Sequence, residues 1–345
     1  MKTAAAAFSS QGYKLAQKLK ELNLADTVTG IGIFAQEQEL NEKISLAEWT
    51  EREFYASDAL IFISSCGIAV RAAAKHVSSK KSDPAVIVMD EGANFAVSLL
   101  SGHLGGANEL CRRIAQKTGA QPVITTATDV RGVFSADSWA KSQGMHIDNL
   151  DMVKAVSAGI LEGRQIGLVC EADISGCPEE LSAGSGAELG ICVSYSTDRD
   201  YFKNTLYLIP QDIVVGIGCR KNTPYEDIKT AVYAALKNSD IDIRAVRYIA
   251  SIDLKKSEEG IVRFCGEHGI EFLTFSAAEL NSISGSVSSS DFVAGVTGTD
   301  NVCERAALAV GDAVLVSPKK VYSKATAAVS RLRREYSFEY RNDGN

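Results

Sequence analysis

Hydrophobic and polar positions alternate along the first 145 residues in the manner of an α/β protein. Short apolar runs predict strands at residues 3–8, 30–35, 59–64, 85–90 and 122–126. Between these runs, apolar residues recur at helical spacing and predict helices at 10–22, 67–77, 104–118 and 134–143. Because the strands are apolar on both faces and are separated by helices, the pattern indicates a parallel sheet covered by helices.

The rest of the chain repeats this alternation on a smaller scale. A helix near 150–162 and strands at 165–171, 190–195 and 205–210 predict a small middle α/β region. After residue 212, further strands are predicted at 246–252, 270–275, 313–316 and 325–332. The predicted organisation is a Rossmann-like N-terminal domain at 1–145, a middle region at 146–210, a second α/β domain at 211–333 and a tail at 334–345.

Composition and charge narrow the class of protein. A chain of 345 residues, 46% hydrophobic and 23% charged, is long enough for about two domains. The net charge of −7 argues against a nucleic-acid partner. No apolar run reaches the roughly 18 residues of a membrane helix, and MKTAAAAFSSQGYK lacks the features of a secretory signal. We therefore expect a cytoplasmic protein that binds no membrane.

The cysteines and histidines predict no metal site. The eight cysteines form no C-x-x-C pair and are expected to be reduced thiols. The four histidines show no zinc-ligand spacing. We therefore expect no metal ion held by the protein itself.

One segment of the first domain stands out, LLSGHLGGANELCRRIAQKTG at residues 99–119. Its second half is an ordinary amphipathic helix, but its first half places His103 between Gly102 and the pair Gly105 and Gly106. Three glycines cost backbone entropy and add nothing to a core. We expect them to let the backbone pass close to a ligand, with the imidazole facing a cleft. There it could act as a base, a hydrogen-bond donor or a loop cap.

Polar residues follow two of the predicted strands, and the carboxyl ends of parallel strands are where ligands bind. Asp90 and Glu91 could supply a carboxylate base, could orient His103, or could serve only at a helix start or in a turn. Thr125, Thr126 and Asp129 could supply hydroxyl donors and an acid, or could cap the next helix.

Basic residues near two predicted helix starts are candidates for binding a carboxylate. Arg71 follows Cys66, but their spacing is one residue short of a phosphatase C-x5-R loop, so we exclude a phosphate-cradling thiol. Arg220 follows Gly218 in GIGCRK, where Lys221 occupies the third glycine position of a dinucleotide fingerprint. The dinucleotide interpretation therefore fails, and Arg220 remains as an anion contact.

Two helix starts in the third region carry further polar residues. Thr223, Pro224 and Glu226 predict a capping box. Asn301 and Glu304, in TGTDNVCERAAL, could contact a ligand or could simply cap a short helix.

Taken together, these segments resemble a known family. DPAVIVMDEGANFAVSLLSGHLGGANELCRRIA, followed by PVITTATDV, resembles the N-terminal domain of the cobalt-precorrin 5A hydrolases of anaerobic vitamin B12 biosynthesis. VVGIGCRKNT and TGTDNVCERAAL resemble the C-terminal domain of the same family. The resemblance covers roughly residues 55–145 and 212–330 and is weak in the middle region.

The resemblance implies a hydrolase that acts on a cobalt-bearing corrinoid macrocycle with a δ-lactone. Water opens the lactone, and the bridging carbon leaves with its methyl group as acetaldehyde, giving cobalt-precorrin 5B. No cofactor is implied, because the cobalt arrives with the substrate. Neighbouring enzymes of the cobalamin pathway are the further partners that this family would meet.

Applied to this chain, the resemblance leads to a hypothesis for the site. His103 would be the base, oriented by Glu91 or Asp90. The oxyanion would be stabilised by two hydroxyls and two backbone N–H groups, those of Thr125, Thr126, Gly105 and Gly106. Arg71 and Arg220 would hold peripheral carboxylates of the macrocycle from either domain, placing it in the cleft between the domains. The other residues expected near the substrate are Gly102, Asp129, Gly218, Asn301 and Glu304.

Two other functions are considered. A non-catalytic carrier of corrinoid intermediates would use the same arginines and glycines but would not need His103. Acetaldehyde production from the purified protein would distinguish the enzyme from the carrier. A nucleotide-dependent enzyme is weakened by the missing phosphate loop.

Overall fold

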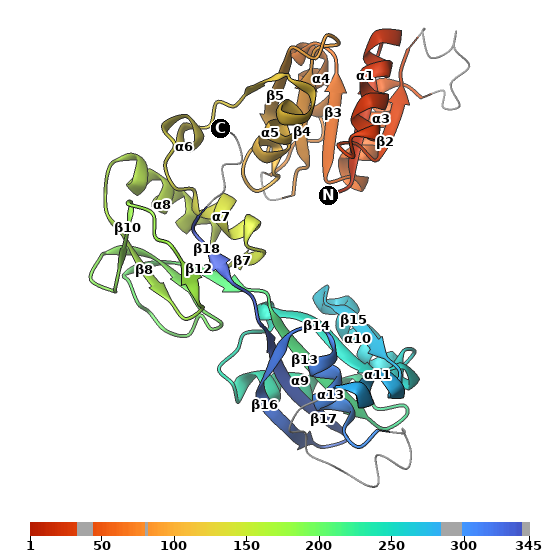
Figure 1. Cartoon of the computed structure of the whole chain (residues 1–345), viewed down its shortest axis with the longest axis vertical. Helices are drawn as coiled ribbons and strands as arrows, with labels where there is room; N and C mark the ends of the chain where they lie inside the picture. The colour runs from red at the N-terminus through yellow and green to blue at the C-terminus, as the bar shows by residue number, and fades with distance from the viewer. Residues whose placement is uncertain (33–43, 80–81, 284–298, 340–345) are drawn as a thin grey trace. The chain divides into compact units, whose positions relative to one another are not determined.

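The computed structural model describes residues 1–32, 44–79, 82–283 and 299–339. Two compact units make up the chain, Met1–Ser138 and Trp139–Tyr340. Figure 1 colours the first from red to yellow and the second from yellow to blue. Within the described ranges, no helix combines the length and the apolar character needed to cross a membrane.

A six-stranded sheet forms the centre of the first unit. In spatial order its strands are β2 (Thr27–Gly30), β1 (Thr3–Ala7), β3 (Ala59–Ile63), β4 (Ala85–Met89), β5 (Phe95–Leu100) and β6 (Gln121–Val123). The first four are parallel to one another, and this parallel-dominated sheet confirms the predicted fold class. β5, which was not among the predicted strands, pairs antiparallel with β4 because only a short turn separates them.

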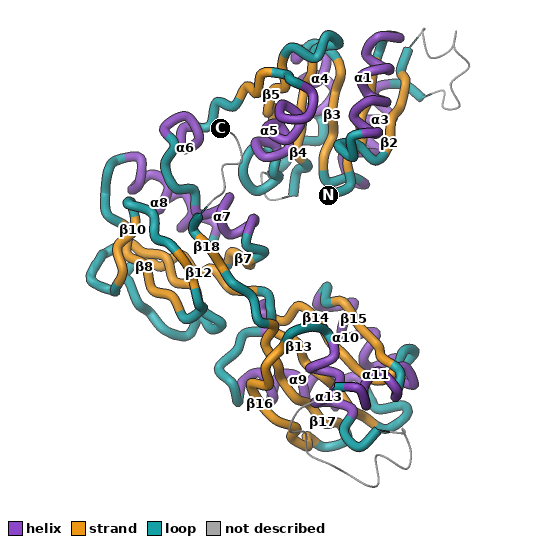
Figure 2. Tube along the Cα trace, in the orientation of Figure 1, coloured by secondary structure: helices purple, strands orange, loops and turns teal. Residues whose placement is uncertain are grey.

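Helices cover both faces of this sheet, as Figure 2 shows. α1 (Ser10–Glu21) and α5 (Ala107–Thr118) pack on one face, and α3 (Leu46–Ala56) and α4 (Cys66–Ala73) on the other. Successive β3 residues point to opposite faces, so Leu60 and Ile61 are both fully buried. Each such side chain contributes roughly 1.5–3 kcal/mol. Two short helices follow β6, namely α6 (Ala127–Arg131) and α7 (Ala136–Ser142).

The second unit begins with a smaller five-stranded sheet. In spatial order its strands are β10 (Leu181–Ala183), β8 (Ile166–Cys170), β11 (Leu189–Val193), β12 (Asn204–Pro210) and β7 (Met145–Ile147). All are parallel except β7. The helix α8 (Leu150–Leu161) follows β7. Near the end of the chain, β18 (Tyr336–Ser337) pairs with β9 (Ile174–Ser175), which ties part of the predicted tail to this region.

A second five-stranded sheet completes this unit. Its spatial order is β15 (Glu271–Phe275), β14 (Val246–Ile252), β13 (Ile213–Cys219), β17 (Ala325–Leu332) and β16 (Ala313–Tyr322). The first three strands are parallel, and β17 is antiparallel to both of its neighbours. Helices pack on both faces, α9 (Tyr225–Lys237) and α10 (Glu259–His268) on one, and α11 (Ala277–Ser282) and α13 (Val302–Ala309) on the other. The 3-10 turns η1 (Ile243–Ala245) and η2 (Asp253–Lys255) flank β14.

A glycine on β13 allows α13 to pack directly against the sheet. A Cβ atom on Gly216 would lie 1.9 Å from the carbonyl oxygen of Cys303. Any larger residue would therefore push the helix away. This close contact brings the first turn of α13 to the carboxyl end of β13.

The predicted capping box at Thr223 is wrong. The N-cap of α9 is Pro224, and no side chain caps it. Thr223 instead donates its hydroxyl to the carbonyl of Arg220 (2.9 Å) and its N–H to Oε1 of Glu258 (3.0 Å). The carboxylate that accepts the N–H of Thr223 is thus that of Glu258, at the start of α10. The sequence pattern had assigned this role to Glu226.

Candidate active site

The loop that carries His103, between β5 and α5, is shaped by its glycines. Gly106 is the N-cap of α5, with a left-handed φ of 88°. A Cβ atom on Gly105 would lie 2.2 Å from Cβ of Ser101. On Gly102 it would lie 2.8 Å from Oδ1 of Asn108. The packing of the loop on itself therefore accounts for all three glycines without a ligand.

The ring of His103 lies between two carboxylates. Its Nε2 is 2.9 Å from Oδ2 of Asp129, and its Nδ1 is 3.3 Å from Oδ1 of Asp137. The hydroxyl of Thr128 is also 3.2 Å from Nε2. With 16% of its side chain exposed, His103 is largely shielded from solvent. Both ring nitrogens are occupied by residues of α6 and α7.

Asp129 is held by donors from two further helix positions. Nδ2 of Asn108 donates to Oδ2 of Asp129 (2.9 Å), and the guanidinium of Arg112 donates to Oδ1. Asn108 and Arg112 both belong to α5, so the carboxylate links α5 to α6. We call His103, Asn108, Arg112, Asp129 and Asp137 the His103 cluster.

The cluster determines the charge of His103. Burial disfavours the imidazolium, but the hydrogen bonds and charges of Asp129 and Asp137 outweigh burial and raise the pKa of His103 to about 9. Burial alone would raise the pKa of each carboxyl, yet the contacts with His103 hold both below their usual value. At neutral pH the ring is protonated, so the structure does not support the prediction that His103 is a general base.

Asp90 and Glu91 make other contacts. Asp90 closes the turn between β4 and β5 and accepts the N–H of Phe95 (2.7 Å). Burial works against its charge, but such backbone donors hold the pKa of Asp90 below its usual value. Glu91 accepts the hydroxyl of Ser9 before α1. The prediction that either carboxylate orients His103 is therefore wrong, because aspartates of α6 and α7 occupy the ring.

The predicted oxyanion donors differ in whether their N–H or O–H groups are already used in hydrogen bonds within the protein. The N–H of Gly106 is used, since it donates to the carbonyl of His103 (2.9 Å). The N–H of Gly105 has no acceptor within the part of the chain that the structure describes. Thr125 is exposed. Thr126 accepts one hydrogen bond (3.0 Å) and keeps its own proton to donate.

Sequence reasoning missed Asn108, Arg112 and Asp137. Asn108 is only 4% exposed although it is polar, so an amide on the inward face of an amphipathic helix was the available signal. Asp137 is 3% exposed, in the short segment SADS. Nothing local marks either residue as a partner of His103, because both contacts are tertiary.

Arg71 lies on α4 and is exposed. Its guanidinium folds back over the helix start, where a Cβ atom on Gly67 would lie 3.5 Å from Nη1. It takes no part in the hydrogen bonds of the His103 cluster. Among the described residues, Arg71 is thus a surface cation without an ion-pair partner.

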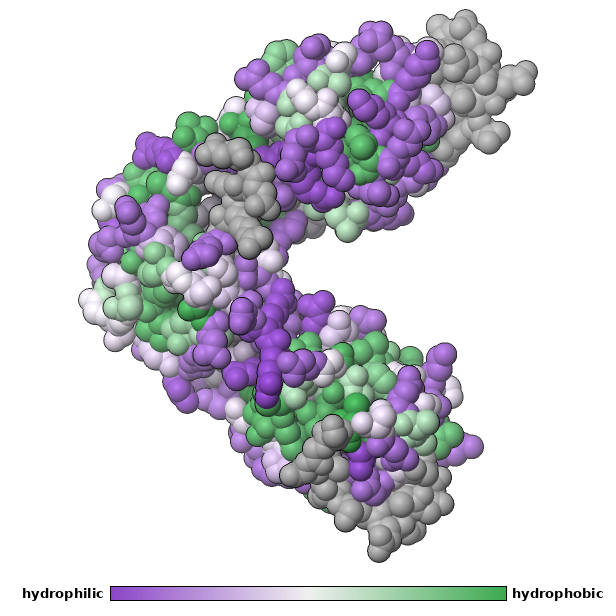
Figure 3. Space-filling view, viewed as in Figure 1, coloured by the Kyte–Doolittle hydropathy of each residue, from purple (hydrophilic) through white to green (hydrophobic). Residues whose placement is uncertain are grey.

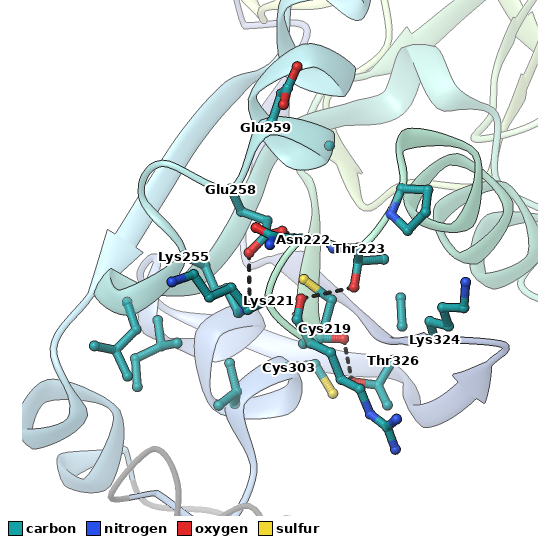
Figure 4. A pocket seen from close by; sticks show the side chains of 18 of the residues that line it. Cys219, Lys221, Asn222, Thr223, Lys255, Glu258, Glu259, Cys303, Lys324 and Thr326 are labelled. Atoms are coloured by element: carbon teal, nitrogen blue, oxygen red, sulfur yellow. Dashed lines mark hydrogen bonds and ion pairs between the residues drawn. The ribbon is translucent and has the colours of Figure 1, made fainter.

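The second unit contains a cavity of about 1290 Å³ at the carboxyl ends of β13 and β14, which we call the C-terminal cavity. Its walls come from the β13–α9 loop, η2, the start of α10, the first turn of α13 and the β16–β17 hairpin (Figure 4). Open α/β sheets bind ligands in this position. The volume exceeds the roughly 300–1,000 Å³ typical of small-molecule sites, so a macrocycle has room.

Two of the four binding residues predicted in this unit line the cavity. They are Gly218 and Arg220. Asn301 and Glu304 do not contact it and are at most 1% exposed. Glu304 accepts the N–H of Lys319 (2.6 Å) and the amide of Asn301 (2.8 Å). These contacts favour the capping role over the predicted ligand contact, because both side chains make hydrogen bonds at the start of α13.

Cations outnumber acids on the cavity wall. The cations are Arg220, Lys221, Lys255, Arg263, Lys319 and Lys324, and the acids are Glu258 and Glu259. Lys255 pairs with Glu258 (3.0 Å). Across the described ranges, Arg220, Lys221 and Lys319 have no ion-pair partner. A chain of net charge −7 thus keeps a local surplus of positive charge here, which favours an anionic ligand.

Known proteins resemble this chain along most of its length. Three family models match in order, "Cobalamin synthesis G N-terminal" at 48–129, "Cobalamin biosynthesis central region" at 134–210 and "Cobalamin synthesis G C-terminus" at 213–330. A protein of Salmonella typhimurium named cobalt-precorrin-5A hydrolase is 36% identical over 274 residues, which cover 76% of this chain and 78% of the relative. The chain belongs to the cobalt-precorrin-5A hydrolase family.

A second relative extends the match to the whole chain. The cobalt-precorrin-5A hydrolase of Priestia megaterium is 31% identical over 354 residues, covering 95% of this chain and 94% of the relative. A solved structure of a cobalamin biosynthesis protein G homolog from Sulfolobus solfataricus covers 96% of this chain and 97% of its own, with 21% identity and a TM-score of 0.42. The predicted family resemblance is confirmed, and the central model includes the middle region where the resemblance was weak.

In this member of the cobalt-precorrin-5A hydrolase family, the cavity also exposes apolar side chains. Leu254 on η2 is 66% exposed and Val321 on β16 is 72% exposed, and both line the cavity. Figure 3 shows apolar surface (green) gathered over the part of this unit that carries β13 to β17. A ligand with a flat apolar face and a charged edge would match both kinds of side chain.

Side chains able to hold a metal were also considered. In the described part of the chain, no group of three or more His, Cys, Asp or Glu residues could hold a metal ion. Cys219 and Cys303 line the C-terminal cavity. Burial raises the pKa of both, that of Cys303 to about 11, so both are neutral thiols at pH 7.

Proposed function

We propose that this chain is a cobalt-precorrin-5A hydrolase. Water opens the δ-lactone of the cobalt corrinoid, acetaldehyde leaves, and cobalt-precorrin 5B remains. The observation that carries the proposal is the match to relatives of that name at 36% and 31% identity over most of the chain. Models of all three regions of the family match this chain in order, which also supports the proposal.

The corrinoid binds in the C-terminal cavity in this proposal. The side chains of Arg220, Lys221 and Lys319 have no ion-pair partner in the described ranges and take peripheral carboxylates of the macrocycle. The exposed side chains of Leu254 and Val321 cover apolar ring surface. Because the cobalt belongs to the substrate, the reaction draws on no metal or redox cofactor of the protein.

Within its described ranges, the first unit keeps two hydrogen-bond donors unused near the His103 loop. The N–H of Gly105 and the hydroxyl of Thr126 are the groups left to donate there. His103 is a positioning residue in this account. Its imidazolium ties the loop to α6 and α7. After the lactone opens, the freed hydroxyl loses its proton, acetaldehyde forms as the carbon–carbon bond breaks, and the macrocycle accepts the electron pair.

We place the enzyme in the cytoplasm, among the other enzymes of the cobalamin pathway. All eight cysteines are free, which suits a reducing compartment. The partners expected there are the corrinoid substrate and the enzymes that supply it and take the product.

Acetaldehyde release tests the proposed activity. Purified protein is mixed with cobalt-precorrin 5A, and acetaldehyde is measured by its enzymatic reduction with NADH. We expect one acetaldehyde for each substrate consumed. Corrinoid binding without acetaldehyde would instead establish the carrier function, for which the cavity alone would suffice.

The role of His103 is tested by the dependence of the rate on pH. A base with a pKa of about 9 would make the wild-type rate rise steadily from pH 6 toward pH 9. As a positioning residue, His103 gives no such rise. His103→Gln then lowers kcat between pH 6 and about pH 8, and the difference from wild type shrinks toward pH 9 as the wild-type ring loses its charge.

A further inference from the structure

We propose that Arg263 on α10 determines specificity in the C-terminal cavity by binding a carboxylate of the ligand. Glu267 and Tyr225 hold it ready for that contact. The inference deepens the proposed function and rests on it for the identity of the ligand as a corrinoid polycarboxylate. No sequence motif marked Arg263, and the three residues come together only through the packing of α9 on α10.

The side chain of Arg263 is held at two points. Its Nε donates to Oε1 of Glu267 (2.8 Å), and its Cζ lies 4.2 Å above the ring centre of Tyr225. The hydroxyl of Tyr225 donates to Oε2 of the same Glu267 (2.5 Å). One carboxylate therefore fixes both the guanidinium and the ring beneath it.

This arrangement leaves the outer edge of the guanidinium available. Arg263 and Tyr225 line the cavity, whereas Glu267 does not. Nε is the only atom of Arg263 with a hydrogen-bond partner among the described residues, so both terminal nitrogens can still donate. Their parallel N–H groups match the two oxygens of a carboxylate.

The fixed position of the guanidinium distinguishes Arg263 from the other cations of the wall. An arginine that is already ordered loses little rotamer freedom when a ligand binds. Arg263 is exposed, as are Arg220 and Lys221, but those two have no such support among the described residues. The hydrogen bond to Glu267 also raises the pKa of Tyr225 to about 12, so the phenol remains a donor. Arg263 is thus suited to select one carboxylate position, while the other cations of the wall add general attraction.

The experiment measures binding of two matched probes by the full chain. One probe is cobyrinic acid, a cobalt corrinoid with free peripheral carboxylates, and the other is its fully methylated ester. For Arg263→Ala we expect the Kd for the acid to rise about tenfold, as for the loss of a charge-assisted bidentate contact. The Kd for the ester is expected to stay unchanged. Arg263→Lys keeps the charge but not the paired N–H groups, and we expect it to recover only part of the loss.

Three further variants distinguish a specific carboxylate contact of Arg263 from a general attraction by positive charge. Glu267→Gln and Tyr225→Phe loosen the guanidinium without removing it, so each should raise the Kd for the acid by about threefold. Arg247→Ala is the matched control. Arg247 also lies over a tyrosine, with its Cζ 5.3 Å from the ring centre of Tyr248, but outside the cavity wall. It should change neither Kd.

Several results would overturn the inference. They are equal binding of the acid by wild type and Arg263→Ala, equal losses for acid and ester, and no binding of cobyrinic acid by the wild type. Displacement of the corrinoid by inorganic phosphate would show a phosphate site instead. Acetaldehyde release by the wild-type enzyme is measured separately, so the proposed function can stand while this inference fails.

Discussion

The His103 cluster and the C-terminal cavity use similar residues in opposite ways. In the cluster, each charged side chain meets a partner from the chain itself, and His103 and Asp129 are each only 16% exposed. In the cavity, Arg220, Lys221 and Lys319 have no ion-pair partner within the described ranges, and Leu254 is exposed. Charges that are satisfied internally stabilise structure, whereas unsatisfied charges around an open volume are available to a ligand.

The two regions also differ in the evidence that points to a function, which is a sequence motif in the His103 loop and unpaired charge in the C-terminal cavity. Glycines and a histidine in one short segment drew attention to the N-terminal loop, yet packing accounts for Gly102, Gly105 and Gly106. The cavity carries weaker motifs but a stronger physical signal, because three cations on the wall of an open volume have no ion-pair partner within the described ranges. The four predictions below test this contrast.

The largest effect is expected from removing the shared carboxylate of the cluster. Asp129→Ala removes one acceptor each from His103, Asn108 and Arg112, and leaves the His103 imidazolium with a single carboxylate in a shielded site. We expect the free energy of unfolding of the first unit to fall by about 3 kcal/mol. Urea unfolding followed by fluorescence measures it. Asp151→Ala, which removes a 90% exposed carboxylate paired with Lys154 in the second unit, should cost that unit almost nothing.

A similar loss from both aspartate variants would contradict the contrast. It would mean that the cluster is no better shielded than a surface ion pair.

The next effect concerns pH. The pKa of His103 is raised on folding to about 9, so its contribution to stability is complete below pH 6.5 and is lost as pH rises through 9. We expect wild type to exceed His103→Gln in stability by about 2 kcal/mol at pH 6. The gap should close toward pH 9.5. Unfolding curves of both proteins across this range measure it, and a gap that does not vary with pH would show that the ring is neutral.

A smaller effect is expected from filling the loop. Gly105→Ala places a methyl group 2.2 Å from Cβ of Ser101, so the loop must shift, at a cost of about 1–2 kcal/mol. Gly186→Ala is the control, because a Cβ atom there meets nothing within 4 Å. Thermal unfolding compares the two variants. Equal melting temperatures would mean that the loop does not require glycine at this position for packing.

The smallest effect is expected in the cavity, where several cations share the attraction. Arg220→Ala should raise the Kd for cobyrinic acid about threefold to fivefold, with no loss of stability. The effect should shrink in high salt, because Arg220 is exposed. Titration at two salt concentrations measures it. Lys256→Ala, which removes a neighbouring cation outside the cavity wall, should leave the Kd unchanged. An equal rise in Kd for both variants would mean that Arg220 acts only through its charge and makes no specific contact with the ligand.

Much of the fold could be predicted because it depends on local periodicity. The buried strand Ala59–Ile63 and the helix Ala107–Thr118 follow directly from runs and stripes of apolar residues. The strand Phe95–Leu100 was missed, since its residues are only partly buried and it pairs through a hairpin. The candidate site was predicted less well. Gly218 and Arg220 line a cavity, but Asn301 and Glu304 are turned to internal contacts.

The amino-acid sequence by itself determined the α/β class, the family and the segments that border the site, because periodicity and motifs are properties of neighbouring residues. Only the tertiary structure decided which charges meet. Asp129 lies 26 residues after His103, and their contact makes the imidazole a cation rather than a base. Arg263 became a candidate only when α9 brought Tyr225 beneath it. Pairing and burial set the protonation and availability of a side chain, and both depend on residues that are distant along the chain.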